Sequence, residues 1–116
     1  MQVTRIYTDA DGESHFEDIN IPLTDAGDIG ALSEMVKATG IIFRETNGDY
    51  DYNFHNAPQR QYVVMLDGEV DIEIGDGTIR RFTTGDILLA EDTTGRGHRS
   101  FAVNGNSRKS IFITLD

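Results

Sequence analysis

The feature that most constrains the fold is a series of short strand patterns separated by turn dipeptides in the middle of the chain. Residues 61–66 (QYVVML) are strongly apolar, and the Asp67-Gly68 pair after them is a turn dipeptide that tolerates positive φ. Residues 69–74 (EVDIEI) alternate acidic and aliphatic side chains, which predicts a half-exposed antiparallel strand with its acids in water. Asp76-Gly77 marks a second turn before another short strand at residues 78–82.

The flanking sequence has the same character. Further strands are predicted at residues 3–7, 16–21, 35–45, 87–90, 98–103 and 109–115. Residues 22–33 are predicted as a loop with one helical turn, and no segment shows a long helical period. Many short strands at close spacing predict an all-β sandwich or barrel.

Length and composition predict one globular domain. The chain has 116 residues, of which 38% are hydrophobic and 26% are charged, enough for a single core. The absence of cysteine excludes disulfide scaffolds, thiolate catalysis and cysteine-bound zinc. The first residues lack the apolar run of a secretory signal, and no stretch has the length of a membrane span. We therefore expect a cytoplasmic protein.

The charge balance limits the partners. Ten basic residues against twenty acidic ones give a net charge of −10. Nucleic acids and anionic membranes require a basic surface, so we expect neither as a partner.

The strand predicted at residues 61–66 has apolar side chains on both faces. Tyr62, Val64 and Leu66 share one face, and Gln61, Val63 and Met65 share the other. Burying such side chains contributes roughly 1.5–3 kcal/mol each, so both faces should be covered. One face can line a barrel interior, while the other needs the N-terminal strands or a second subunit. We expect a homodimer.

Two glycine-bounded segments carry the candidate chemistry. In the first, Gly48 is followed after six residues by His55-Asn56-Ala57, after three more by Gln61, and after six more by Gly68. In the second, Gly85 precedes an apolar strand, and then come Glu91, Asp92 and finally His98.

This spacing resembles the two sequence motifs of the cupin superfamily over residues 48–103, and it is similar to a subgroup of small, uncharacterised single-domain cupins. The resemblance implies one domain over residues 1–116 with a double-stranded β-helix, or jelly-roll barrel, of two packed antiparallel sheets. The motifs are imperfect: Ala57 and Gln61 stand where cupins place a histidine and a glutamate, and His98 comes two residues late.

The resemblance also implies a site. His55, Gln61 and His98 would be ligands of a divalent transition metal, among which iron, manganese, nickel and zinc are not distinguished. Glu91 or Asp92 could supply a further ligand or an acid/base group. Replacing an imidazole by a methyl group and a carboxylate by an amide should lower metal affinity. If Gln61 points inward, strand parity turns Val63 and Met65 inward as well.

Two other residues are pocket candidates. Arg44 could bind a substrate carboxylate or phosphate from inside the barrel, or it could lie at the surface or at a dimer interface. Tyr52, which precedes His55, could line a ligand pocket or pack as a core aromatic residue.

Three functions are compatible with these residues. The first is binding of a small molecule in the barrel with a metal-dependent reaction of the dioxygenase, isomerase or lyase type. The second is a non-catalytic, metal-free module that binds a small ligand. The third is a metal-free enzyme that uses a histidine as acid or base. Fold alone does not choose among them.

Overall fold

The computed structural model describes residues 1–116 as twelve strands and one short 3-10 helix. The strands are β1 (Gln2–Thr8), β2 (Ser14–Asn20), β3 (Thr24–Asp25), β4 (Ala31–Leu32), β5 (Gly40–Thr46), β6 (Asp51–His55), β7 (Gln61–Asp67), β8 (Val70–Glu73), β9 (Ile79–Phe82), β10 (Ile87–Ala90), β11 (His98–Ala102) and β12 (Arg108–Thr114). The helix η1 spans Gly27–Ile29.

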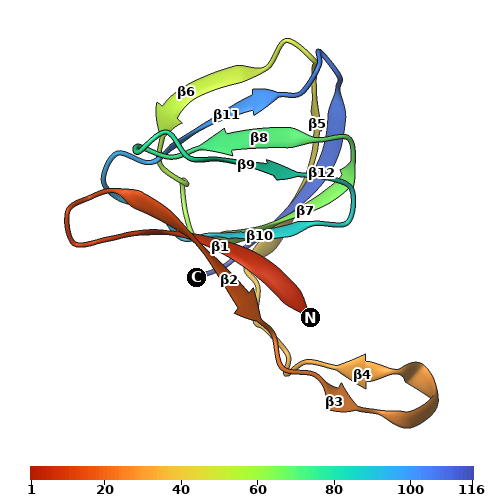
Figure 1. Cartoon of the computed structure of the whole chain (residues 1–116). Helices are drawn as coiled ribbons and strands as arrows, with labels where there is room; N and C mark the ends of the chain where they lie inside the picture. Colours follow the sequence, from red (N-terminus) through yellow and green to blue (C-terminus); the bar gives the residue numbers. More distant parts are fainter.

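Two sheets face each other and form the barrel (Figure 1). One has the strand order β2-β1-β10-β7-β12-β5 and the other has the order β6-β11-β8-β9. After β5 the chain passes repeatedly between the two sheets, which is the arrangement of a jelly roll. The predicted all-β jelly-roll barrel is therefore confirmed. One detail differs: β1 pairs with β10 in parallel, so the larger sheet is mixed.

The predicted strands match the structure except near β5. A strand was predicted over residues 35–45, but β5 begins only at Gly40, where its pairing with β12 ends at Thr114, the last residue of β12. The loop predicted at residues 22–33 contains the expected helical turn, Gly27–Ile29. It also contains β3 and β4, which pair only with each other and project from the barrel (Figure 1).

The two turn dipeptides, Asp67-Gly68 and Asp76-Gly77, connect different kinds of strand pairs. Gly68 has a φ of 87°, as its turn position requires. The strands on either side of it do not form a hairpin, because β7 belongs to the larger sheet and β8 to the smaller one. The turn at Asp76-Gly77 does connect a hairpin, in which β8 pairs with β9.

The core lies between the two sheets. Its buried members are Ile6, Ala57, Met65, Val70, Ile72, Ile74, Phe82, Leu88 and Ala90. The alternation in β8 turns its aliphatic residues inward, as predicted. The prediction that its acids are all solvated is wrong for Asp71, which is buried and accepts two hydrogen bonds from Arg81, at 2.9 and 3.1 Å. A neighbouring cation thus replaces the water that this carboxylate would otherwise require.

The chain has a single short helical turn, and no helix in the structure has the length and apolar character needed to cross a membrane.

Candidate binding pocket

A cavity of about 360 Å³ opens between the two sheets. Twelve of its 21 lining residues are hydrophobic, and its polar residues include Arg44, His55, Gln61, His98, Ser100, Arg108 and Ser110. This size and mixture are typical of sites for small organic molecules.

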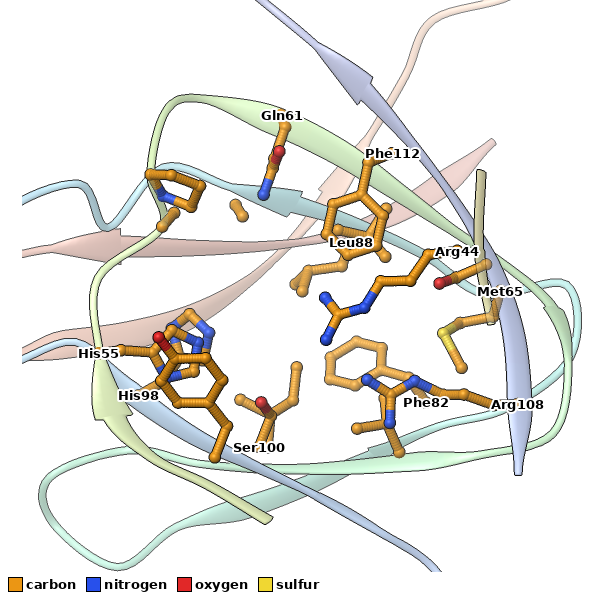
Figure 2. Close-up of a pocket in the computed structure, with 18 of the residues that line it drawn as sticks. Arg44, His55, Gln61, Met65, Phe82, Leu88, His98, Ser100, Arg108 and Phe112 are labelled. Atoms are coloured by element: carbon orange, nitrogen blue, oxygen red, sulfur yellow. The ribbon is translucent and has the colours of Figure 1, made fainter. Parts of the chain in front are cut away.

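His55 and His98 lie side by side on the smaller sheet. They occupy opposite positions where β6 and β11 pair, and their ring centroids are 4.6 Å apart. Gly97 permits this approach, because it has a φ of 78° and a Cβ there would collide with the carbonyl oxygen of His55. The backbone thus holds both imidazoles at one end of the cavity (Figure 2).

Asp92 orients His98 from behind. The carboxylate is fully buried, and its Oδ2 lies 2.6 Å from His98 Nδ1 and accepts a 2.8 Å hydrogen bond from the Ser14 hydroxyl. An ionised carboxylate can only accept, so Nδ1 carries the proton in this pair. Nε2 of His98 then remains available to a molecule in the cavity.

His55 is held in a similar way by the backbone. Its Nδ1 lies 2.7 Å from the carbonyl oxygen of Asn53, and its ring packs 3.9 Å from that of Tyr52 between centroids. Burial lowers the pKa of His55, and the charges of His98 and Arg44 lower it further, against the opposing effects of Asn53 and Asp92. His55 is therefore neutral near pH 7, with Nε2 free to accept a hydrogen bond.

This lowered pKa predicts a pH-dependent contribution to stability. Because the folded chain resists protonating His55, its contribution is present above the ordinary pKa of 6.5 and is lost as pH falls below that value. In urea unfolding between about pH 7.5 and about pH 5, wild type should lose stability relative to His55→Phe. His15→Phe, which replaces an imidazole outside the cavity by the same apolar ring, is the control. A wild-type advantage that stays constant or grows toward low pH would contradict the assignment.

Two arginines reach into the cavity from adjacent strands of the larger sheet (Figure 2). Arg44 is on β5 and Arg108 begins β12, and their guanidinium groups lie 5.4 and 4.6 Å from the ring centre of Tyr50. Arg108 is only 7% exposed, and its Nη1 is buried without a hydrogen-bond partner. Burial lowers the pKa of Arg108, as does the charge of Arg44, although a guanidinium stays protonated at neutral pH.

The other arginines of the chain are all neutralised. Each of the six lies within ion-pair distance of a carboxylate: Arg5, Arg60, Arg80, Arg81, Arg96 and Arg99. Arg44 and Arg108 form no such pair, although acidic residues outnumber basic ones two to one. The two arginines without an ion pair thus both lie in the cavity, whereas the two lysines, Lys37 and Lys109, are exposed.

The predicted site residues that line the cavity lie on both sheets. Gln61 is buried and faces the cavity together with Val63 and Met65, as strand parity predicts. It belongs to the larger sheet, opposite the sheet that carries the two histidines. Arg44 and Tyr52 also line the cavity.

Glu91 and Asp92 do not line the cavity, which corrects their assignment as pocket residues. Glu91 is bound by Arg5 and Arg60, at 2.5 and 2.7 Å. Burial alone would raise the pKa of Glu91, but the hydrogen bonds from these two arginines outweigh it and lower the pKa. Asp92 lies on the side of His98 away from the cavity and orients its ring through the contact with Nδ1.

The residues around the histidines do not fit the metal centre that the resemblance implies. No group of three or more histidine, cysteine, aspartate or glutamate side chains is placed to hold a metal ion. The cavity offers two imidazoles and, on the opposite sheet, an amide, but no carboxylate. Two guanidinium groups share the cavity and would repel a dication.

Elemental analysis tests the metal prediction directly. We expect untagged wild type, grown with metal supplements, to retain far less than one equivalent of any divalent transition metal, because the anionic ligand is missing. His98→Ala should give the same low value. Near-stoichiometric metal in wild type that is lost in His98→Ala would contradict this expectation and restore the metal site.

Several cavity residues were not among the candidates from the sequence. They are Tyr50, Ser110, Phe112 and Arg108. Arg108 lies one residue before the strand predicted at residues 109–115, next to a turn, where an arginine is ordinarily solvated. The strand alternation that turns Ser110 and Phe112 inward also turns Arg108 inward, and this is the one signal that could have identified it.

Comparisons with known proteins support the fold only. No protein-family model matches the chain, and no curated protein matches it. Among solved structures it is similar to protein NMB1881 from Neisseria meningitidis, with a TM-score of 0.52 and 18% identity over 72% of this chain and 81% of that one. A proposed ethanolamine utilization protein Q from Salmonella typhimurium has a TM-score of 0.44 and 12% identity, over 97% of this chain and 94% of that one.

Proposed function

We propose that this chain is a small cupin whose barrel binds a small organic anion without a resident metal. Membership of the cupin superfamily is supported by the motif spacing over residues 48–103 and by the jelly-roll order of the two sheets. The chemical class of the ligand is supported by the polar groups of the cavity.

The observation that carries the proposal is the pair of unpaired guanidinium groups. Burying a charge without a partner is costly, and the cost is greatest for Arg108, which is more than nine-tenths buried. Nη1 of Arg108 and the hydroxyl of Ser110 both lack hydrogen-bond partners, and both residues line the cavity. A carboxylate bound there would satisfy both arginines with charge-assisted hydrogen bonds.

The rest of the cavity restricts the shape of the ligand. The walls near the arginines are apolar, and include Met65, Leu88 and Phe112 (Figure 2). Nε2 of both His55 and His98 is left free by their other contacts. We therefore propose a ligand with a carboxylate for the arginines, an apolar body, and a polar group that reaches the histidines.

Identification of the bound compound tests this proposal. Untagged protein would be incubated with a cell metabolite extract, desalted and analysed by native mass spectrometry, and the released compound would be identified after denaturation. We expect a small organic acid near one per chain with wild type, and a much lower occupancy with the Arg44→Met/Arg108→Met variant. A neutral or cationic compound, equal occupancy in the variant, or no captured compound would contradict the proposal.

The buried contact of Asp92 with His98 favours a second candidate function, acid/base catalysis on the bound anion. A histidine whose Nδ1 is fixed by a buried carboxylate presents Nε2 in a defined orientation, which suits proton transfer to or from a ligand. His98 would take a proton from the ligand and His55, neutral and adjacent, could receive or return one.

Solvent isotope exchange tests this second candidate. With the acid captured above, wild type in D2O should incorporate deuterium into the acid faster than the uncatalysed rate, and His98→Gln should lose that excess. His15→Gln, which changes a histidine outside the cavity, should behave as wild type. Binding without any excess exchange in wild type would leave a binding module and exclude this proton transfer.

A further inference from the structure

The wall of the cavity carries positive charge and no negative charge. Although the chain contains twenty acidic residues, none of them is among the residues that line the cavity. Asp92 is buried on the far side of His98, and its Oδ2 is already engaged by Ser14 and His98. Arg44 and Arg108 therefore place two positive charges on the wall that no carboxylate of the cavity offsets.

The two charges are held close together. The guanidinium groups of Arg44 and Arg108 lie 5.4 and 4.6 Å from the centre of the same ring, that of Tyr50, and both point into the cavity (Figure 2). The negative face of an aromatic ring attracts cations, which explains how the free chain tolerates the two arginines. A ring carries no net charge, however, so the repulsion between the two cations remains.

One carboxylate can bridge the two arginines, but it leaves most of their donors and one of their charges unmatched. Two guanidinium groups present about ten N–H donors, whereas one carboxylate offers about four acceptor sites. Ser110 adds a further donor: it is 3% exposed, stands opposite Arg44 in the β5–β12 ladder, and its hydroxyl has no partner. Nη1 of Arg108 is likewise buried without a partner. A ligand with two charges and twice as many acceptor sites fits this wall better than a single carboxylate.

We propose that the ligand of this barrel is a dicarboxylate, with one carboxylate on Arg44 and the other on Arg108. The inference rests on the organic anion proposed above and specifies its charge. Each carboxylate pairs with one planar guanidinium, which is the geometry that such pairs favour. Because both arginines lie near the ring of Tyr50, a short carbon linker joins the two carboxylates, and the apolar body of the ligand extends from that linker.

Calorimetric titration of the full chain at about pH 7.5 with a matched set of acids tests the second charge. Butylmalonate differs from hexanoate by one carboxylate, butylsuccinate lengthens the linker by one carbon, and the monomethyl ester of each diacid keeps its size but has a single charge. Wild type should bind the better of the two diacids about 30-fold or more tightly than its monomethyl ester or hexanoate, because a second buried charge pair forms.

Variants of the wall assign the two carboxylates. Arg44→Met and Arg108→Met should each reduce the preference for the diacid over its monomethyl ester to about threefold or less, because only one guanidinium remains. Ser110→Ala, which removes one neutral donor, should weaken binding of the diacid by about 3–10-fold. Arg80→Met is the matched control, because Arg80 pairs with Asp18 outside the cavity, and it should keep the full preference for the diacid.

The outcomes separate the dicarboxylate from the organic anion on which it rests. If wild type binds hexanoate or a monomethyl ester as tightly as the diacids, and Arg44→Met/Arg108→Met loses that binding, the barrel still recognises an anion and the dicarboxylate is excluded. A preference for the diacid that survives in both single arginine variants also overturns the dicarboxylate. If no acid binds, or if binding does not depend on the arginines, both proposals are wrong.

Discussion

Replacing Asp92 with alanine is expected to lower the free energy of unfolding by about 3–5 kcal/mol. Asp92 is fully buried and joins elements that are distant in sequence, because its Oδ2 contacts both the Ser14 hydroxyl on β2 and Nδ1 of His98 on β11. Alanine would leave these two groups buried without their partner and would open a void beside the barrel. Few other single polar side chains in this fold should be as costly to remove.

Urea unfolding at neutral pH and fixed protein concentration measures this effect. Asp92→Asn, which keeps the shape and loses the charge, should lie between wild type and Asp92→Ala. Asp11→Ala, at an exposed turn position, should change stability by less than about 0.5 kcal/mol. An Asp92→Ala variant as stable as the Asp11→Ala control would show that the buried contacts with His98 and Ser14 do not stabilise the fold.

Replacing Arg108 with methionine is expected to have opposite effects on stability and binding. The free chain should become more stable by about 1–3 kcal/mol, since a buried cation without a partner is replaced by an apolar side chain of similar length. Affinity for the organic acid should fall about 30-fold or more, because a buried charge-assisted contact is lost. A residue kept only for packing would not give these opposite signs.

Two measurements on the same variant test this prediction. Urea unfolding without ligand gives the stability, and calorimetric titration with the captured acid gives the affinity. Arg80→Met is the matched control, because Arg80 pairs with Asp18 at 2.9 Å outside the cavity. The control should not gain stability and should bind as wild type does. An Arg108→Met variant that is destabilised, or that binds the acid with unchanged affinity, would contradict the assignment of Arg108 to ligand binding.

The fold was predictable because its signals are local. Acid–aliphatic alternation, turn glycines and short apolar runs each specify a strand or a turn within a few residues. The strands β3 and β4 were not predictable at the same level, since two-residue strands carry no periodicity. Residues 35–39 were predicted as part of a strand because two of them are large and apolar, but the structure leaves them exposed, and strand pairing begins only at Gly40.

The candidate site was predictable only in part, because its contacts join residues far apart in the chain. Strand parity correctly placed Gln61, Val63 and Met65 on one face, but the direction of that face was left open, and Arg44 was only one of the pocket candidates. The role of Asp92 depends on Ser14, 78 positions away in sequence, and on His98 across a loop. The role of Arg108 depends on the absence of any carboxylate near it. Whether a carboxylate lies near an arginine is decided by other strands of the fold, so no local sequence pattern predicts it.

The central claim is that the barrel recognises a negative charge through Arg44 and Arg108. The most direct measurement is calorimetric titration of untagged wild type and Arg44→Met/Arg108→Met with pairs of compounds, each captured or related carboxylic acid matched with its neutral amide. The account predicts that wild type binds the acids, binds the amides far more weakly, and loses its preference for the acids when both arginines are replaced. Equal affinity of wild type for acid and amide, or an unchanged preference in the double variant, would contradict it.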